Sequence, residues 1–391
     1  MRYEFRLAEL LGHTPDRRKR PGTIKAIVEY TGLDRHQVAS LLKNEAKYIP
    51  LEALSRLCDY LVEHGYANGD ELPGVLFAVK PEHFWEVIAR RKKLEICVGV
   101  RRPDGEDAPE TAWVVASDAV LMGEVLNGVS TLGGTEKFKA NSSDQDSGRE
   151  IQTHPEMLRQ TLVWSPSPVD GASEAIERSK EVHKDFVSTS GDKALICLGS
   201  LKSNPVVEML IADVFMVDPF ESEDDVERAV DRSCPFFLRY RDTDPHIASA
   251  SAGVQLSKTE KADQPGIYYE QADGKWVYAG GQDTALVFYV YREPLGRLEM
   301  VLSGFSGRAT RLLARTLTNR SEEFWPPVYA ANDLQIGAFI VQYQEAAQAS
   351  LPSDILRTDV IGNPTVTAIP VEAIARRIER RASRSNTETN E

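Results

Sequence analysis

The segment that most constrains the fold is a pair of short helical patterns separated by a glycine. The first pattern runs from Thr23 to Tyr30 and the second begins at Asp34, with Thr31-Gly32-Leu33 between them. Their apolar residues fall on one helical face each: Ile24, Ile27 and Val28 in the first, Val38, Leu41 and Leu42 in the second. A small residue between two short helices permits a steep turn. We therefore expect a helix-turn-helix over residues 23–42.

Signals at the helix ends agree with this interpretation. Asp34 is a good N-cap, and Gln37 stands three residues later, where a capping box places its second partner. A further helix is expected from Pro50 to about Val62, because proline is favourable in the first helical turn. Another is expected from Tyr3 to Leu11, before the pair.

The front of the second helix of such a motif is the surface that reads DNA. With Val38 and Leu41 turned inward, six polar residues face solvent there: Arg35, His36, Gln37, Ser40, Lys43 and Asn44. Side chains of these types donate to and accept from base edges and phosphates in the major groove. We also expect the basic loop before the pair to contact phosphates through Arg17, Arg18 and Arg20. The alternative is a helical bundle for protein contact with an ordinary solvated face.

A family resemblance is carried by the pattern Ile27-Val28-x-x-x-Gly32-Leu33-x-x-x-x-Val38-x-x-Leu41, by Asn44, and by the following helix Leu51-Glu-Ala-Leu-Ser-Arg-Leu-Cys58. The segment resembles the phage-repressor/Cro type of helix-turn-helix, the XRE family, over about residues 1–75. The resemblance implies binding to double-stranded DNA, with Arg35, His36, Ser40 and Lys43 facing the bases. Two features depart from the family: Val28 stands where alanine is usual, and the basic loop before Thr23 is long.

The charge distribution is compatible with DNA binding although the chain is acidic overall. The net charge is −13, but residues 1–64 contain 11 Lys+Arg against 9 Asp+Glu, and the remainder contains 35 against 50. A phosphate-binding surface must be locally positive, whatever the total charge. The acidic remainder is expected to stay away from the duplex.

Other sequence features exclude several classes of protein. No stretch approaches the roughly 18 apolar residues that a membrane helix needs, and the N-terminus lacks a signal-peptide apolar core, so we expect a cytoplasmic protein without membrane contact. The four cysteines and seven histidines are scattered and do not pair at ligand spacing. We therefore expect buried free thiols, no metal and no cofactor.

The rest of the chain alternates strands with helices, which indicates a layered α/β domain with a mixed sheet. Expected strands are 94–100, 111–115, 194–198, 235–240, 285–291, 298–302 and 335–343, expected helices 116–126, 175–185, 205–215 and 309–317, and a hairpin joins 266–269 to 275–279. The predicted organisation is an all-α helix-turn-helix domain at 1–79, a connecting helix at 80–93, an α/β sensor or oligomerisation domain at 94–378, and a disordered tail at 379–391. A polar loop is expected at 135–150.

Two strands of this domain lead through polar, glycine-bearing turns into helices, and the turns are candidates for binding an anionic ligand. The first turn offers Gly199, Ser200, Lys202, Ser203 and Asn204, and the second offers Gly304, Ser306 and Arg308. If both strands are parallel, both turns lie at the same sheet edge, where helix N-termini favour anions. Neither turn matches the dinucleotide or Walker spacing. The alternative is that Ser200, Asn204 and Ser306 merely cap helices.

The sequence therefore predicts a sequence-specific DNA-binding regulator whose α/β domain senses a small anionic ligand, dimerises, or does both. Homodimers are expected because one domain of this type reads only a few base pairs. No nucleophile elbow or nucleophile–histidine pattern supports catalysis. Two rivals stay open: a nucleotide-processing α/β enzyme recruited to DNA by its N-terminal domain, and a protein-interaction adaptor.

Overall fold

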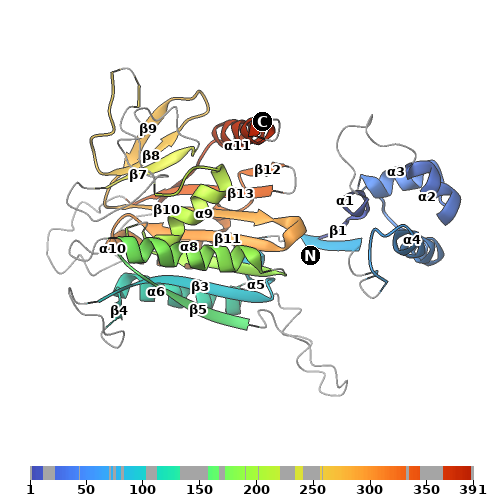
Figure 1. Cartoon of the computed structure of the whole chain (residues 1–391), viewed down its shortest axis with the longest axis horizontal. Helices are drawn as coiled ribbons and strands as arrows, with labels where there is room; N and C mark the ends of the chain where they lie inside the picture. The colour runs from blue at the N-terminus through green and yellow to red at the C-terminus, as the bar shows by residue number, and fades with distance from the viewer. Residues whose placement is uncertain are drawn as a thin grey trace, which may run out of the picture. The chain divides into compact units, whose positions relative to one another are not determined.

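The computed structural model divides the chain into two compact units, Met1–Glu82 and His83–Glu391 (Figure 1). It describes residues 2–11, 23–43, 45–69, 72–73, 76–80, 83–102, 112–132, 157–166, 172–189, 191–200, 202–220, 234–240, 256–257, 259–331, 334–343 and 364–388. The predicted loop at 135–150 lies outside these ranges.

The first unit is a small helical domain closed by two short strands. Its elements are β1 (Arg2–Phe5), α1 (Leu7–Leu10), α2 (Thr23–Thr31), α3 (Arg35–Leu42), α4 (Leu51–Glu63) and β2 (Phe77–Lys80). The core contains the inward residues that the pattern predicts, with Ile27, Val38 and Leu57 fully buried. Burial of this apolar face supplies most of the stability that such short helices lack alone. The helix-turn-helix expected over residues 23–42 is confirmed as a fold.

One prediction in this unit is wrong. The helix expected from Tyr3 to Leu11 begins only at Leu7, and Arg2–Phe5 is instead a strand antiparallel to β2. The ring of Phe5 packs edge-on against that of Phe77 at 5.3 Å. The partner strand lies more than seventy positions along the chain, so a local helical pattern could not show this pairing.

The second unit is built on a large mixed sheet with the strand order β12-β13-β10-β11-β6-β3-β4, to which β14 adds beside β13 and β5 beside β3. Its strands are β3 (Lys93–Arg101), β4 (Trp113–Val114), β5 (Met157–Trp164), β6 (Lys193–Leu198), β10 (Thr284–Arg292), β11 (Arg297–Gly304), β12 (Tyr329–Ala331), β13 (Leu334–Gln342) and β14 (Thr365–Ala368). The pairs β5–β3, β3–β6 and β6–β11 are parallel, whereas β10 and β13 run antiparallel.

Helices cover both faces of this sheet, which confirms the layered α/β architecture (Figure 1). They are α5 (Phe84–Ala89), α6 (Ala116–Asn127), α8 (Ser173–Ser188), α9 (Val206–Phe215), α10 (Gly307–Arg320) and α11 (Val371–Glu388). Alternate residues of β6 enter opposite cores: Leu195 and Cys197 pack with α8 and α9, whereas Ile196 packs with α5, α6 and α10. A strand buried on both faces needs the continuous apolar run that the sequence has there.

A smaller sheet of β7 (Phe236–Arg239), β8 (Gly266–Glu270) and β9 (Trp276–Gly280) lies beside the large one. The predicted hairpin is present as β8–β9, and Gly274 has φ +87° in its turn. All four cysteines are free, and three of them are buried as expected, whereas Cys58 is half-buried.

Several elements of this unit differ from expectation, and β12, β14 and the first part of α11 have no counterpart among the expected elements. The helix expected at 80–93 is only Phe84–Ala89, and all six residues are buried in the core of the second unit. Strand β5 has no counterpart among the expected elements, because only Thr161 and Val163 of its eight residues are buried and its pattern is weak. The tail expected to be disordered from 379 continues α11 as far as Glu388.

A buried ion-pair cluster attaches α11 to the β8–β9 hairpin. Glu270 is 4% exposed, and its Oε2 accepts hydrogen bonds from Nε and Nη2 of Arg377 at 3.0 and 2.7 Å. Its Oε1 accepts from Nη2 of Arg376 at 3.1 Å. Arg377 is 1% exposed, and its guanidinium lies 5.8 Å from the ring of Trp276. A charge this deeply buried must keep its partner.

We predict that Glu270→Gln lowers the free energy of unfolding by about 3–5 kcal/mol, because it removes the buried negative charge that pairs with Arg377. Urea unfolding of the full chain measures this change. The control is Lys275→Ala, which removes the exposed Lys275–Asp273 pair of the same hairpin and should cost less than about 1 kcal/mol. Equal effects of the two substitutions would show that the buried cluster has no special role.

Candidate functional site

The turn between α2 and α3 is held by specific backbone and side-chain contacts. Gly32 has φ +74°, a conformation that glycine adopts without strain. Thr31 Oγ1 donates to the carbonyl of Ile27 at 2.6 Å and accepts from the N–H of Leu33 at 3.3 Å. Leu33 is 5% exposed and fills the junction between the helices. The turn therefore fixes the crossing angle that a recognition helix needs.

The N-terminus of α3 carries the predicted capping box. Asp34 Oδ1 accepts from the N–H of Gln37 at 2.8 Å, and the N–H of Asp34 donates to Oε1 of Gln37 at 3.1 Å. The cap orders the first turn, which is the part of a recognition helix that approaches base edges. The same contacts engage the side-chain oxygen of Gln37, so this residue is a poorer candidate for reading bases than its position suggested.

The exposed front of α3 is made by three of the predicted residues. Arg35, His36 and Lys43 are exposed, whereas Ser40 is half-buried. Asn44 and the basic-loop residues Arg17, Arg18 and Arg20 lie outside the described residues. The connection to α4 adds a residue that sequence reasoning missed: Tyr48 is 78% exposed, and an amphipathic hydroxyl-bearing ring of this kind is suited to a phosphate contact.

We predict that Arg35→Ala weakens binding to a duplex selected from random DNA by about 1–3 kcal/mol and has a smaller effect on unselected DNA, because a guanidinium at a base edge discriminates between bases. Fluorescence anisotropy with both duplexes measures the two losses. Arg178→Ala, which removes a half-buried arginine from α8 in the second unit, is the control and should change neither. Equal losses on both duplexes would argue against direct base readout by Arg35.

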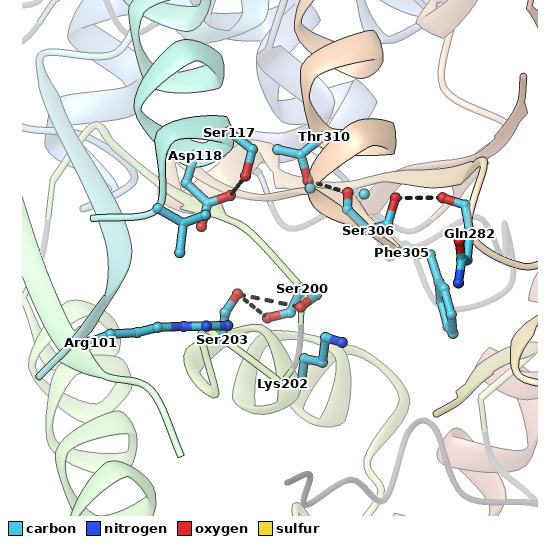
Figure 2. Close-up of a pocket in the computed structure, with 13 residues that line it drawn as sticks. Arg101, Ser117, Asp118, Ser200, Lys202, Ser203, Gln282, Phe305, Ser306 and Thr310 are labelled. Carbon is cyan, nitrogen blue, oxygen red and sulfur yellow. Dashed lines mark hydrogen bonds between the residues drawn. The ribbon is translucent and has the colours of Figure 1, made fainter. Parts of the chain in front are cut away.

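In the second unit, the two predicted glycine-bearing turns lie at the same edge of the large sheet. Strands β6 and β11 pair in parallel from Lys193–Arg297 to Leu198–Leu302, so their carboxyl ends meet. The geometric part of the expectation is therefore confirmed. Between the turns lies a pocket of about 300 Å³ (Figure 2). It is lined by Arg101, Val115, Ser117, Asp118, Ser200, Lys202, Ser203, Gln282, Gly304, Phe305, Ser306, Gly307 and Thr310.

Two glycines allow the walls of this pocket to approach each other. Gly199 has φ +94°, and a Cβ there would lie 2.8 Å from Ser203 Oγ and 3.0 Å from Asp118 Oδ2. A Cβ on Gly304 would lie 2.2 Å from the backbone nitrogen of Thr310, at the start of α10. No side chain fits at either position without displacing the backbone or these polar groups. The glycines are thus required by the geometry of the pocket.

The pocket holds charges of both signs. Arg101, at the end of β3, is exposed, and Nζ of Lys202 lies 5.7 Å from the centre of the Tyr240 ring. Asp118, in the first turn of α6, is 4% exposed and accepts a hydrogen bond from Ser117 Oγ at 3.2 Å. Burial raises the pKa of Asp118, and the hydrogen bond from Ser117 and the charge of Arg101 partly oppose that rise.

Some predicted ligand residues have structural roles instead. The amide of Asn204 donates to the carbonyls of Cys97 and Leu198, both at 3.0 Å, and its oxygen accepts from the N–H of Val206 at 3.3 Å. Asn204 is fully buried and does not line the pocket, so its role is to tie the turn to the ends of β3 and β6. Arg308 does not line the pocket either, since its Nε lies 3.5 Å from Oδ1 of Asp283. The electrostatic attraction between Arg308 and the Asp283 carboxylate explains why the arginine side chain lies outside the pocket.

Ser306 combines both roles. Its hydroxyl accepts from the N–H of Ala309 at 3.1 Å as the N-cap of α10, and it donates to the carbonyl of Gln282 at 2.6 Å. Sequence reasoning missed several pocket residues, which come from elements that it did not connect with the two turns: Arg101, Ser117, Asp118, Gln282 and Thr310. The available signal was that α6 also begins directly after a strand, with Ser117-Asp118 in its first turn.

A second polar cluster lies elsewhere in the unit. His183, Asp213 and Glu299 place ligand-type atoms within 4.8 Å of one another. However, Arg292 donates to Asp213 Oδ2 at 2.7 Å and to Glu299 Oε2 at 3.3 Å, and Arg297 lies 3.3 Å from the other oxygen of Glu299. Two guanidinium groups already balance the two carboxylates, so a divalent cation would add uncompensated positive charge. The arrangement is that of a buried ion-pair network.

Comparison with known proteins identifies one part of the chain. Residues 17–62 match the family model of the Cro/C1-type helix-turn-helix DNA-binding domain, which confirms the resemblance found over residues 1–75 for this segment. No curated protein and no solved structure matches the chain. Within the described ranges, no helix has the length and apolar character needed to cross a membrane.

Proposed function

We propose that this chain is a sequence-specific, DNA-binding transcriptional regulator whose second unit senses a small anionic ligand and forms a homodimer. The first part rests on the Cro/C1-type segment and on α3, which combines an ordered, capped N-terminus with the exposed cations Arg35 and Lys43. An exposed cationic helix front is what a major groove attracts and reads.

The polar pocket is the observation that carries the sensing role. It lies outside the carboxyl ends of parallel strands, where α/β proteins bind ligands, and α6, α9 and α10 all begin around it. Amide ends of helices favour negative charge, each by about 0.3–1 kcal/mol. Arg101 and Lys202 add two cations. Together these groups favour an anion more strongly than either glycine-bearing turn does alone.

Control of DNA binding follows if the ligand prefers one conformation of the chain. A ligand changes DNA affinity only through its differential affinity for the two conformations, and such couplings are typically about 1–3 kcal/mol. The pocket can transmit such a preference because its lining comes from helices on both faces of the sheet. It contacts α6 and α10 on one face and the turn that leads into α9 on the opposite face. A ligand in contact with all three would bias their packing.

The dimer is supported by the edge strand β5. Its pairing within the described residues is with β3 alone, and Met157, Leu158 and Leu162 are 53%, 56% and 47% exposed. An unpaired strand edge with exposed apolar side chains is a ready surface for a second chain. A dimer also carries two recognition helices, as the two half-sites of helix-turn-helix operators require.

We predict that inorganic phosphate raises the melting temperature of the full chain and that the double variant Arg101→Ala/Lys202→Ala loses this response, because the pocket then lacks both cations. Differential scanning fluorimetry in a phosphate series measures it. The control is Lys180→Ala/Lys184→Ala, which removes two exposed charges from α8 and should respond like the wild type. A phosphate response that is the same in both double variants would place the anion elsewhere.

A further inference from the structure

We propose that the natural ligand of the pocket is a phosphate ester of a polyhydroxyl compound, such as a sugar phosphate, and that Asp118 accepts a hydrogen bond from one of its hydroxyls. This inference rests on the proposed anion site and goes beyond it, because it assigns a second chemical group to the ligand. It follows from the two-signed charge of the pocket, the burial of its hydroxyls, and the orientation of its aromatic side chain.

The charges of the pocket come from different walls. Figure 2 shows Arg101 and Lys202 beside the turn that carries Ser200 and Ser203, whereas Asp118 and Ser117 lie across the pocket at the start of α6. When a phosphate contacts the two cations, the side of the pocket formed by Asp118 stays open to a different group of the same ligand. A carboxylate repels a bare anion but attracts the O–H of a hydroxyl, so the ligand must carry both groups.

The carboxylate of Asp118 is built into the pocket. It is 4% exposed, and Ser117, which donates to its Oδ1, is 2% exposed. The other oxygen, Oδ2, lies 3.0 Å from the position of a Cβ on Gly199, so it points toward the turn that bears Ser200 and Ser203. Removing a carboxylate from water is costly unless it gains hydrogen bonds. A hydroxyl donor from a ligand supplies such a bond at Oδ2.

Serine and threonine hydroxyls surround the remaining space. Ser200, Ser203 and Thr310 are 7%, 7% and 2% exposed, and all three line the pocket. Thr310 donates its hydroxyl proton to the carbonyl of Ser306 at 3.0 Å, so its oxygen faces a ligand as an acceptor, which suits the hydroxyl donors of a polyol. Ser203 Oγ donates to the carbonyl of Ser200 at 3.1 Å and lies 3.3 Å from Ser200 Oγ, so the two linked hydroxyls keep a lone pair on each oxygen for a ligand hydroxyl.

The aromatic side chain of the pocket argues against recognition of a planar base. Phe305 is 5% exposed, and its ring stacks on that of Tyr240 with centroids 5.3 Å apart and planes 11° apart. The Tyr240 ring therefore occupies one face of Phe305, and little of the phenylalanine is open to a ligand. Base recognition relies on open aromatic faces for stacking. The pocket instead favours contacts to hydroxyl and phosphate groups.

Isothermal titration of the full chain with methyl phosphate and with ribose 5-phosphate, glucose 6-phosphate and glycerol 3-phosphate tests this inference. At least one polyol phosphate should bind about tenfold or more tightly than methyl phosphate, because a hydrogen bond to a charged group contributes at least that factor. Asp118→Asn should remove about tenfold of that advantage while methyl phosphate binds as well as before or better, since a negative charge is lost. Asp185→Asn, at an exposed site on α8, should change neither ligand.

The outcomes separate this inference from the proposed anion site. If methyl phosphate binds and none of the three polyol phosphates binds more tightly, the hydroxyl assignment is wrong and the anion site stands. If the advantage exists but survives in Asp118→Asn, the assignment to Asp118 is wrong. If no phosphate compound binds, the anion site itself fails. The wild-type series alone decides the hydroxyl question should the Asp118 variant not fold.

Discussion

The parallel hydrogen bonding of β6 to both β3 and β11 positions the pocket of the second unit. It sends three chain segments out of the sheet at one edge, and two of them pass through glycine-bearing turns. Parallel strands require crossover connections, and right-handed crossovers place helices on both faces. The apolar runs of these strands are the consequence, because a strand covered on both faces exposes no polar side chain. The polar side chains that line the pocket therefore lie beyond the carboxyl ends of these strands and not within them.

At that edge, packing and polarity are combined in a small space. Gly304 allows the N-terminus of α10 to lie against the end of β11, and Asn204 ties the neighbouring turn to the carbonyls of β3 and β6. These contacts are buried and satisfied, so they form a rigid frame. Asp118 lies within this frame with a pKa that burial raises. A rigid frame around a partly compensated carboxylate is the arrangement by which proteins select polar ligands.

Much of the fold could be predicted from the sequence, because its most regular helices and strands have clear local patterns of apolar and capping residues. The α2–α3 pair, the cap at Asp34 and the doubly buried strands β6 and β10 all follow from periodicity and composition over short windows. Strands β1, β2 and β5 were missed because their pairing partners are distant along the chain, and β12 and β14 because they are only three and four residues long. Local sequence propensity cannot predict a strand that is stabilised mainly by pairing with another strand.

The site was accessible only in part, for a similar reason. Ser200, Lys202, Ser203 and Ser306 were found because they follow strands within a few positions. Arg101 and Asp118 reach the same pocket from β3 and α6, which only the three-dimensional strand order brings there. Asn204 was misassigned because a polar side chain before a helix can face either the ligand or the sheet, and packing decides between them.

We propose that this chain joins a base-reading helix to a ligand pocket whose conformation changes when DNA binds. Amide hydrogen exchange of the full chain, with and without a duplex selected from random DNA, tests it most directly. We expect slower exchange in Arg35–Leu42 on binding and, because coupling is reciprocal, a changed rate at the pocket amides of Ser203, Gly304 and Gly307. Unchanged exchange in Arg35–Leu42 would exclude DNA reading by this helix, and unchanged exchange at the pocket amides would exclude the coupling.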